Sequence, residues 1–213
     1  RSYTIGHPYP REDMRTENLS SQDLINFEEE VKQHFLAGRI RAPVHLSAGN
    51  ELQLIDIFRR IDDQDWVFST WRSHYHALLK GIPAEKVMKR ILAGASMYLN
   101  WPEHRFLASS IVGGTLPIAL GVAMGISKNG GKERVWVFVG DMTAETGIFH
   151  EVTKYAGGYE LPISFIVEDN GLSTNTPTQK VWKPHGERSP DIQTYPYQRG
   201  YPHVGVGSWV TFG

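Results

Sequence analysis

The sequence has no cysteine among its 213 residues, which excludes disulfide bonds and thiol catalysis but does not fix the cellular compartment. Long apolar runs are also missing, since no stretch approaches the roughly 20 residues that a membrane-spanning helix needs. The formal net charge is only −1, so there is no electrostatic case for binding nucleic acid or an anionic membrane. The first residues show no apolar signal-peptide region, and we take the cytoplasm as the default location.

What is present is typical of a folded domain. Hydrophobic residues make up 40% and charged residues 21% of the chain, which favours a globular protein over a disordered one. The length is enough for one α/β domain with a sizeable core, and no linker, repeat or low-complexity tract divides it. We predict a single domain over 1–213, with an extended polar arm at 1–20 and an irregular tail at 179–213. Several aromatic residues near the end suggest contact with a partner.

One stretch predicts a β-α-β unit. Residues 135–139 are apolar or aromatic throughout and fit a buried parallel strand, which ends before Asp141. An amphipathic helical pattern follows, and a second apolar strand at 163–167 ends before Asn170. Ligands of such units bind beyond the carboxyl ends of the strands, so Asp141 and Asn170 are expected to lie side by side over two strands.

This arrangement suits a hard cation that holds a diphosphate. The Asp141 carboxylate, the Asn170 amide oxygen and a backbone carbonyl would give Mg²⁺ three oxygen ligands, and phosphate and water would complete the octahedron. Backbone N–H groups at the start of a helix expected from Thr143 can add donors to the same phosphates. Each residue by itself is more simply explained as a helix cap or an ordinary turn, and it is their spacing that favours a metal site.

The same stretch resembles the thiamine diphosphate motif in the alpha subunit of 2-oxo acid dehydrogenase E1 components. The family pattern is Gly-Asp-Gly, about two dozen residues and Asn-Asn, and here 26 residues (143–168) separate the two parts. Met142 and Asp169 depart from that pattern. The resemblance implies an α/β thiamine diphosphate-binding fold, with a mostly parallel sheet flanked by helices in three layers, and the cofactors thiamine diphosphate and Mg²⁺.

The resemblance also implies a set of site residues within this motif. The metal ligands would be Asp141, Asn170 and the carbonyl of Leu172. The cofactor-binding positions of this stretch would be Gly140, Asp141, Met142, Thr143 and Asn170.

Residues 71–78 carry a second part of the resemblance. They read Trp-Arg-Ser-His-Tyr-His-Ala-Leu, similar to the family's Tyr-Arg-x-His-Gly-His-Ala-Leu. A guanidinium at a strand end suits a bidentate grip on a phosphate. By resemblance, Arg72 binds the diphosphate, Trp71 lies beside the cofactor, and His74 is a candidate catalytic residue that reaches the phosphates.

Two further segments complete the set of candidates. His45 begins a segment similar to the family's His-Leu-x-x-Gly-Gln-Glu, so it would face the active-site entrance and is our other candidate catalytic residue. A loop histidine bonded to the backbone is the alternative. Residues 107–121 resemble the segment ending in Gly-x-Gln-x-Pro, which implies that Ser110 and Val112 touch the cofactor's middle and its aminopyrimidine. A helix-packing seam of small residues would explain the same glycines.

The resemblance implies only half of an active site. In the family, the carboxylate that acts on the aminopyrimidine belongs to the beta subunit, and no glutamate here can be nominated for it. We therefore expect a pyrimidine-binding beta-like subunit as partner, in an α₂β₂-like assembly. The resemblance stops after Thr178, and neither His185 nor His203 can be assigned to the histidine that the family places near the thiazolium.

The implied function is that of an alpha-like subunit of a two-chain enzyme that cleaves or forms a C–C bond next to a carbonyl. Its chemistry would be decarboxylation, dehydrogenation or carboligation of a 2-oxo acid. Two alternatives stay open: a split transketolase-like enzyme with a sugar substrate, and a non-catalytic scaffold subunit that keeps the fold. Met142, Asp169 and Tyr98, which stands where the family has a histidine, favour the scaffold.

Overall fold

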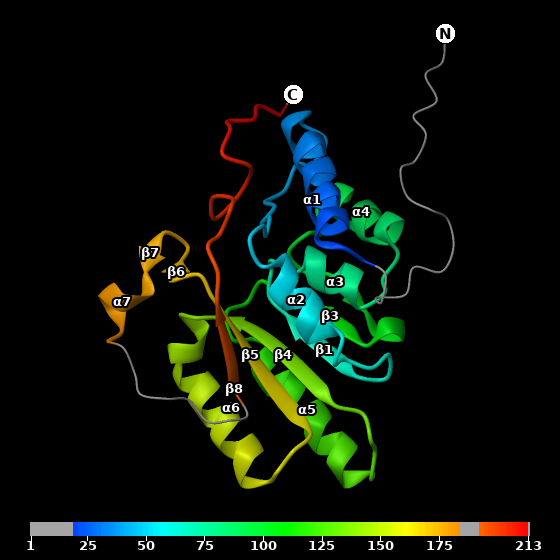
Figure 1. Cartoon of the computed structure of the whole chain (residues 1–213), viewed down its shortest axis with the longest axis vertical. Coiled ribbons are helices and arrows are strands. Elements are labelled where there is room, and N and C mark those ends of the chain that lie inside the picture. Colours follow the sequence, from blue (N-terminus) through cyan, green and yellow to red (C-terminus); the bar gives the residue numbers. More distant parts are fainter. Residues whose placement is uncertain (1–18, 184–191, 213) are drawn as a thin grey trace.

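A mostly parallel sheet of six strands forms the centre of the molecule (Figure 1). The computed structural model describes residues 19–183 and 192–212, so most of the expected arm, His185 and part of the tail lie outside the described residues. The strand order is β2-β3-β1-β4-β5-β8, and all neighbouring strands are parallel except β2 and β3. The strands are β1 (Trp66–Ser69), β2 (Asn100–Trp101), β3 (Phe106–Ala108), β4 (Val135–Gly140), β5 (Ile163–Asp169) and β8 (Ile192–Pro196).

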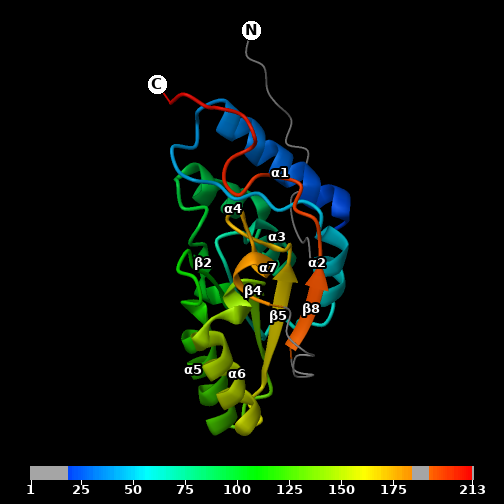
Figure 2. The same ribbon diagram turned by 90° about the vertical axis from the view of Figure 1, so that its left-hand side faces the viewer.

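Helices cover both faces of this sheet, which confirms the predicted three-layer α/β fold (Figure 2). One layer contains α1 (Ser21–Leu36), α2 (Glu51–Phe58), α3 (His74–Leu79) and α4 (Ala84–Leu92). The other contains α5 (Thr115–Lys128) and α6 (Gly147–Gly158). A small hairpin of β6 (Leu172–Ser173) and β7 (Thr176–Pro177) follows β5 and leads into the short helix α7 (Thr178–Val181).

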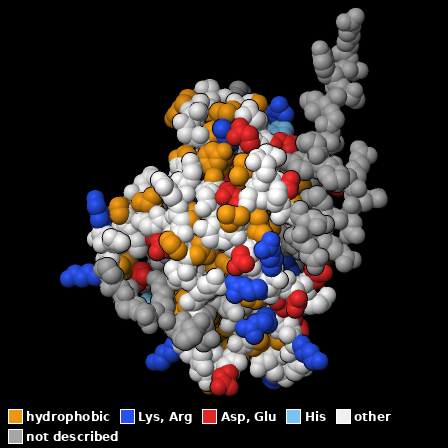
Figure 3. Space-filling model, viewed as in Figure 1, with side chains coloured by type: hydrophobic (Ala, Val, Ile, Leu, Met, Phe, Trp, Pro, Cys, Tyr) orange, Lys and Arg blue, Asp and Glu red, His pale blue; other side chains and the backbone are white. Residues whose placement is uncertain are grey.

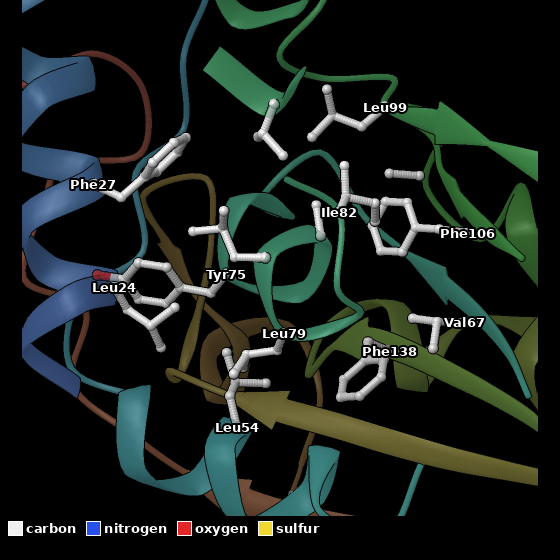
Figure 4. Packing of buried hydrophobic residues seen from close by; sticks show 14 of the residues in the cluster. Leu24, Phe27, Leu54, Val67, Tyr75, Leu79, Ile82, Leu99, Phe106 and Phe138 are labelled. Atoms are coloured by element: carbon white, nitrogen blue, oxygen red, sulfur yellow. The ribbon is translucent and has the colours of Figure 1, made fainter. Parts of the chain in front are cut away.

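The strand β4 shows why two separate cores form. Its side chains alternate between the faces of the sheet. Trp136 and Phe138 join the larger core with α1 to α4, whereas Val135, Val137 and Val139 join the core beneath α5 and α6. Figure 4 shows the larger core, where Phe138 lies near Leu79 and Val67. A strand buried on both faces has the continuous apolar sequence that predicted it.

The first helix begins with a capping box. Its N-cap is Ser20. Its hydroxyl accepts a hydrogen bond from the Asp23 N–H (3.3 Å), and the Asp23 carboxylate accepts one from the Ser20 N–H (2.8 Å). This reciprocal capping box fixes the first turn of α1, so that Leu24, Phe27 and Val31 face the core.

The expected irregular tail is wrong for residues 192–196, which form the edge strand β8. This strand pairs in parallel with β5, from Phe165↔Ile192 to Asp169↔Pro196. Pro196 stands at its last position, where the missing N–H costs no ladder bond. Tyr195 is buried in the larger core and anchors the strand. After β8 the chain runs past the β6–β7 hairpin and ends beside α1 (Figures 1 and 2).

The surface combines apolar and charged side chains. On the face seen in Figure 3, exposed apolar groups are small and are interspersed with charged residues. Within residues 19–183 and 192–212, none of the helices has the length and apolar composition needed to cross a membrane.

Candidate functional site

A cavity opens at the edge of the sheet where the parallel strands end. Segments following β1, β4, β5 and β8 all contribute to its walls. Its volume is about 60 Å³, space for about four water molecules, so it can take small polar groups such as phosphates. The structure places eight of the predicted site residues on its lining: Trp71, Arg72, Gly140, Asp141, Met142, Thr143, Asn170 and Leu172.

The placement of Asp141 follows from the register of β4 and β5. Gly140 pairs with Glu168, so Asp141 and Asn170 both begin just beyond the paired residues of neighbouring strands. Asp141 is buried, and its Oδ2 accepts a hydrogen bond from the Thr178 hydroxyl. Burial raises the pKa of Asp141, although the Thr178 hydroxyl opposes part of this shift. A buried carboxylate whose charge is only partly compensated is a suitable ligand for a cation.

Asn170 turns the chain after β5. Its Oδ1 accepts a hydrogen bond from the Leu172 N–H (3.0 Å), and its Nδ2 donates to the Tyr197 hydroxyl (3.0 Å). Gly171 lies between them with φ +68°, a conformation that glycine adopts without strain. The turn that we weighed as an alternative to a metal site is therefore present. An amide oxygen has two lone pairs, so this turn does not prevent Asn170 from binding a cation.

These groups fit the expected metal. Asp141, Asn170 and the Leu172 carbonyl offer a carboxylate, an amide oxygen and a peptide oxygen around one cavity. Mg²⁺ prefers hard oxygen ligands and keeps some of its water, so a set of this kind is appropriate. Among the described residues there is no cluster of three or more histidine, cysteine or acidic side chains that could hold a metal ion by themselves.

Arg72 lies in the loop between β1 and α3, and it lines the cavity. It is buried, and its guanidinium donates to the carbonyl oxygens of Leu46 and His203, the latter at 3.4 Å. These bonds orient a group with five N–H donors. The orientation is set by backbone atoms of two distant segments, so the cation is held in place before any anion binds.

The helix expected to begin at Thr143 begins four residues later. Residues Thr143–Glu145 form one 3₁₀ turn, and α6 begins at Gly147. Thr146 separates the two, with extended backbone and a hydroxyl that donates to the Thr143 carbonyl (2.7 Å). Backbone N–H groups of Asp141 and Met142 point toward the Asp141 carboxylate and lower its pKa. The cavity is thus bordered by a tight turn rather than by the first turn of a long helix.

The two candidate catalytic histidines lie away from the cavity. His45 is buried behind Trp71 and His203, with ring centroids 6.0 and 4.8 Å away. Burial, followed by the charge of Arg72, lowers the pKa of His45 to about 3, so its ring is neutral at physiological pH. It does not line the cavity, and its predicted place at the active-site entrance stays a prediction.

His74 is fully buried between α1 and the loop before β2. Its Nδ1 lies 3.1 Å from Glu28 Oε1, and its Nε2 lies 2.8 Å from Ser96 Oγ. Both ring nitrogens therefore have partners inside the core. His74 does not line the cavity, because the helix α3 turns its side chain toward α1, and its predicted reach to the phosphates stays a prediction.

Ser110 and Val112 also lie outside the cavity. They belong to the loop between β3 and α5, and both are exposed. Val112 is 56% exposed and its neighbour Ile111 is 71% exposed. Exposed apolar residues at a loop tip have no packing role within this chain. Their predicted contacts with the cofactor stay predictions.

Sequence reasoning missed the other seven residues of the lining: Thr70, Glu168, Ser173, Thr174, Tyr197, Arg199 and His203. Glu168 accepts hydrogen bonds from the Tyr195 hydroxyl (2.6 Å) and Asn50 Nδ2 (3.1 Å), and its Oε2 lies 3.4 Å from His76 Nε2. Burial alone would raise the pKa of Glu168, but His76 and the hydroxyl outweigh it, so the pKa is lowered. The end position of Glu168 in an apolar strand was a signal that could have identified it.

Comparisons with known proteins agree with this geometry. The sequence pattern of the dehydrogenase E1 component family matches residues 20–186. A pyruvate dehydrogenase E1 component subunit alpha from Porphyra purpurea is 33% identical over 162 residues, which cover 68% of this chain and 47% of that protein. The alpha subunit of acetoin:2,6-dichlorophenolindophenol oxidoreductase from Cupriavidus necator is 30% identical over 179 residues, which cover 79% of this chain and 54% of that subunit.

The corresponding subunit from Bacillus subtilis is 31% identical over 165 residues, covering 73% of this chain and 50% of that protein. The chain thus spans about half the length of the curated relatives it matches. The match begins at the cap of α1 and continues through the β6–β7 hairpin, so it includes the whole metal-ligand set. The chain belongs to the dehydrogenase E1 component family and is similar to its alpha subunits.

Proposed function

We propose that this chain is the diphosphate- and Mg²⁺-binding alpha-like subunit of a two-chain thiamine diphosphate enzyme that acts on a 2-oxo acid or a related carbonyl donor. One observation carries the proposal: Arg72, Asp141 and Asn170 come from three segments of the chain and line a single cavity at the carboxyl ends of parallel strands. A fixed cation beside a set of hard oxygen ligands is what a metal-bound diphosphate requires.

Each residue then has a defined task. Asp141, Asn170 and the Leu172 carbonyl would hold Mg²⁺, and Thr178 keeps one oxygen of the Asp141 carboxylate in place. Arg72 would donate to the phosphate oxygens from an orientation already set by the backbone. When bound, thiamine diphosphate supplies an electron sink that stabilises the carbanion left after C–C cleavage. Met142, in place of the family's glycine, adds a flexible apolar side chain to the wall of the cavity.

Two observations support a beta-like partner chain. Glu168 is engaged by Tyr195, Asn50 and His76, and it is the only glutamate on the cavity lining formed by the described residues. Glu168 is thus not free for the aminopyrimidine, which supports a carboxylate supplied by a partner chain. In addition, Ile111 and Val112 expose apolar side chains beside α5, where Ile118 is also 51% exposed. Such groups are suitable for burial at an interface.

The experiment is to co-express the chain with a beta-type subunit and to assay 2-oxo acids and acetoin with an artificial electron acceptor. We expect turnover that requires both chains, thiamine diphosphate and Mg²⁺. Asp141→Asn should abolish it. Asp169→Asn makes the same change of charge at the end of β5, on a side chain that does not line the cavity, and should keep most of the activity.

Other results of this assay would identify an alternative. Cleavage of ketose sugars in place of 2-oxo acids would favour a split transketolase-like enzyme. Cofactor binding with no turnover of any of these substrates would favour a scaffold subunit. An α₂β₂ assembly and a cytoplasmic location are parts of the proposal that size measurement of the co-expressed complex and localisation of a tagged chain would test.

A further inference from the structure

The segment after β8 forms one wall of the cavity. Tyr197, Arg199 and His203 all lie on the lining, although the motifs that identify the family contain none of them. They arrive there because β8 pairs with β5 in parallel, so the chain leaves β8 at the same edge as Asp141 and Asn170. Arg199 thus lies on the same cavity as Asp141 and Asn170, which precede it by about sixty and thirty positions.

This placement is fixed by contacts on both sides. The Tyr197 N–H donates to the Asp169 carbonyl (2.8 Å), and the Gly200 N–H donates to the Ala48 carbonyl (3.2 Å). Gly49 approaches the segment so closely that a Cβ atom there would lie 2.2 Å from the Gln198 carbonyl oxygen. Gly49 also has φ +99°, which favours glycine. The glycine at position 49 therefore allows residues 197–200 to pack closely against the loop before α2.

Arg199 is oriented within this wall. Its Nη1 donates to the carbonyl of Thr174 in the β6–β7 hairpin at 3.2 Å. Thr174 itself lines the cavity, so this bond ties the guanidinium to the hairpin that carries the Leu172 carbonyl. One bond uses a single N–H of the five that a guanidinium carries.

The charges around the cavity indicate an anion. Burial, followed by repulsion from Arg72, lowers the pKa of Arg199. The pKa of His203 is lowered by burial and then by Arg72 and Arg199. The Asp141 carboxylate stands against the two arginines, while the charge of Glu168 is engaged by Tyr195, Asn50 and His76. A metal ion on Asp141 would leave the two arginines without a counter-charge.

We infer that residues 197–203 complete the cofactor site and that Arg199 is a second phosphate-binding cation beside Arg72. This inference rests on the proposed function, because the anion it addresses is the diphosphate of thiamine diphosphate. Arg199 would be a binding residue from the segment 197–203, which lies outside the residues that match the family. Tyr197 is a positioning residue in this account, since it holds Asn170 through its hydroxyl.

The test is calorimetric titration of thiamine diphosphate with Mg²⁺ into the wild type and three variants. Arg199→Gln should weaken binding about 10- to 100-fold, the range for one charge-assisted hydrogen bond to a phosphate. Arg199→Lys keeps the charge without the planar fork and should recover part of the affinity. Arg60→Gln is the matched control, because Arg60 is exposed and bonds to Gln193 in the first half of β8, away from the cavity.

Inorganic pyrophosphate with Mg²⁺ separates this inference from the proposed function. If the wild type binds pyrophosphate but not thiamine diphosphate, the proposed function fails, and the same variants still test Arg199 on pyrophosphate. Equal affinity of the wild type and Arg199→Gln for both ligands would overturn the inference. Tighter binding by Arg199→Gln would also overturn it, because it would mean that the segment blocks the site. Failure of the wild type to bind either ligand would overturn both proposals.

Discussion

The hydroxyl of Thr178 donates a hydrogen bond to Oδ2 of Asp141, which links the start of α7 to the end of β4. This bond crosses 37 positions of sequence and holds one oxygen of the carboxylate toward the hairpin. The other oxygen has no such tie to α7. The hairpin that carries the Leu172 carbonyl is thus joined directly to the residue that we expect to bind the metal.

Removal of this bond should weaken the metal site. Thr178→Val keeps the shape of the side chain but removes the donor, and we expect the affinity for Mg²⁺, measured with thiamine diphosphate present, to fall about 3- to 10-fold, the range of one hydrogen bond. Thr178→Ser keeps the hydroxyl and should stay close to the wild type. Equal losses in both variants would show that packing of the threonine methyl group, and not the bond, is what matters.

The charge of Asp141 should destabilise the metal-free protein. Burial raises its pKa above 3.8 in the folded state, so the folded protein holds the proton more tightly than the unfolded chain does. The contribution of Asp141 to the free energy of unfolding therefore decreases as the pH rises from 3.8 through the raised pKa of the folded state, and it stays low at neutral pH. We expect Asp141→Asn to raise the melting temperature of the metal-free protein at pH 7. This gain should shrink at a pH below 3.8.

Saturating Mg²⁺ and thiamine diphosphate should reverse that order, because only the wild type is stabilised by the bound ligands. Thermal unfolding with and without both ligands measures the reversal. A variant that is less stable than the wild type in both conditions would contradict this account of Asp141.

The buried bond between Tyr195 and Glu168 should contribute to stability. Tyr195→Phe removes a hydroxyl that lies 2.6 Å from the carboxylate, and we expect the free energy of unfolding to fall by about 1.5–3 kcal/mol, as for hydrogen bonds to charged groups. Urea unfolding at pH 7 measures this loss. Tyr197→Phe removes an acceptor for the neutral Asn170 amide and should cost less, about 0.5–1.5 kcal/mol.

The contribution of Glu168 to the free energy of unfolding changes with pH in the opposite direction to that of Asp141. The pKa of Glu168 is lowered in the folded state, so the stabilisation it provides is present above its ordinary value of 4.5 and is lost as the pH falls through the folded pKa. The difference between the wild type and Tyr195→Phe should therefore diminish on acidification. A difference that stays constant from pH 7 to below 4.5 would show that the hydroxyl does not act on the charged carboxylate.

His74 should act on stability rather than on ligand binding. His74→Ala would remove the imidazole that lies 3.1 Å from the buried Glu28 carboxylate, and we expect a loss of about 3–5 kcal/mol in the free energy of unfolding. The fraction that remains folded should bind thiamine diphosphate with nearly wild-type affinity. Arg72→Ala should show the reverse pattern, with weakened binding by the folded protein. A large loss of affinity in folded His74→Ala would restore the role that the sequence suggested.

Much of the fold could be predicted from the sequence because its strongest signals are local. The apolar run of β4, the helical stripe of α6 and the apolar run of β5 each lie within one short window, and the parallel sheet follows from their order. The same order of elements predicts which residues stand at the ends of those strands. Asp141 and Asn170 needed only the β-α-β topology to be brought together.

The remaining parts depend on contacts between distant segments. β8 has only five residues, and its sequence, with Gln193, Thr194 and a terminal proline, does not show the apolar pattern of a buried strand. Without β8 in place, nothing in the sequence directs Arg199 or His203 toward Asp141. The orientation of His74 could not be predicted for another reason. A motif identifies which residues belong together, but the rotation of α3 decides that His74 faces α1 while Arg72 faces the cavity.

The most direct test of the central claim is calorimetric titration of thiamine diphosphate into the wild type and Asp141→Ala, with Mg²⁺ and with a chelator. We predict binding by the wild type that requires Mg²⁺ and becomes tighter when a beta-type subunit is present. Asp141→Ala should show no metal-dependent binding in either setting. Binding by the wild type that is unchanged by the chelator, or equal binding by Asp141→Ala, would contradict the assignment of this cavity as a site for a metal-bound diphosphate.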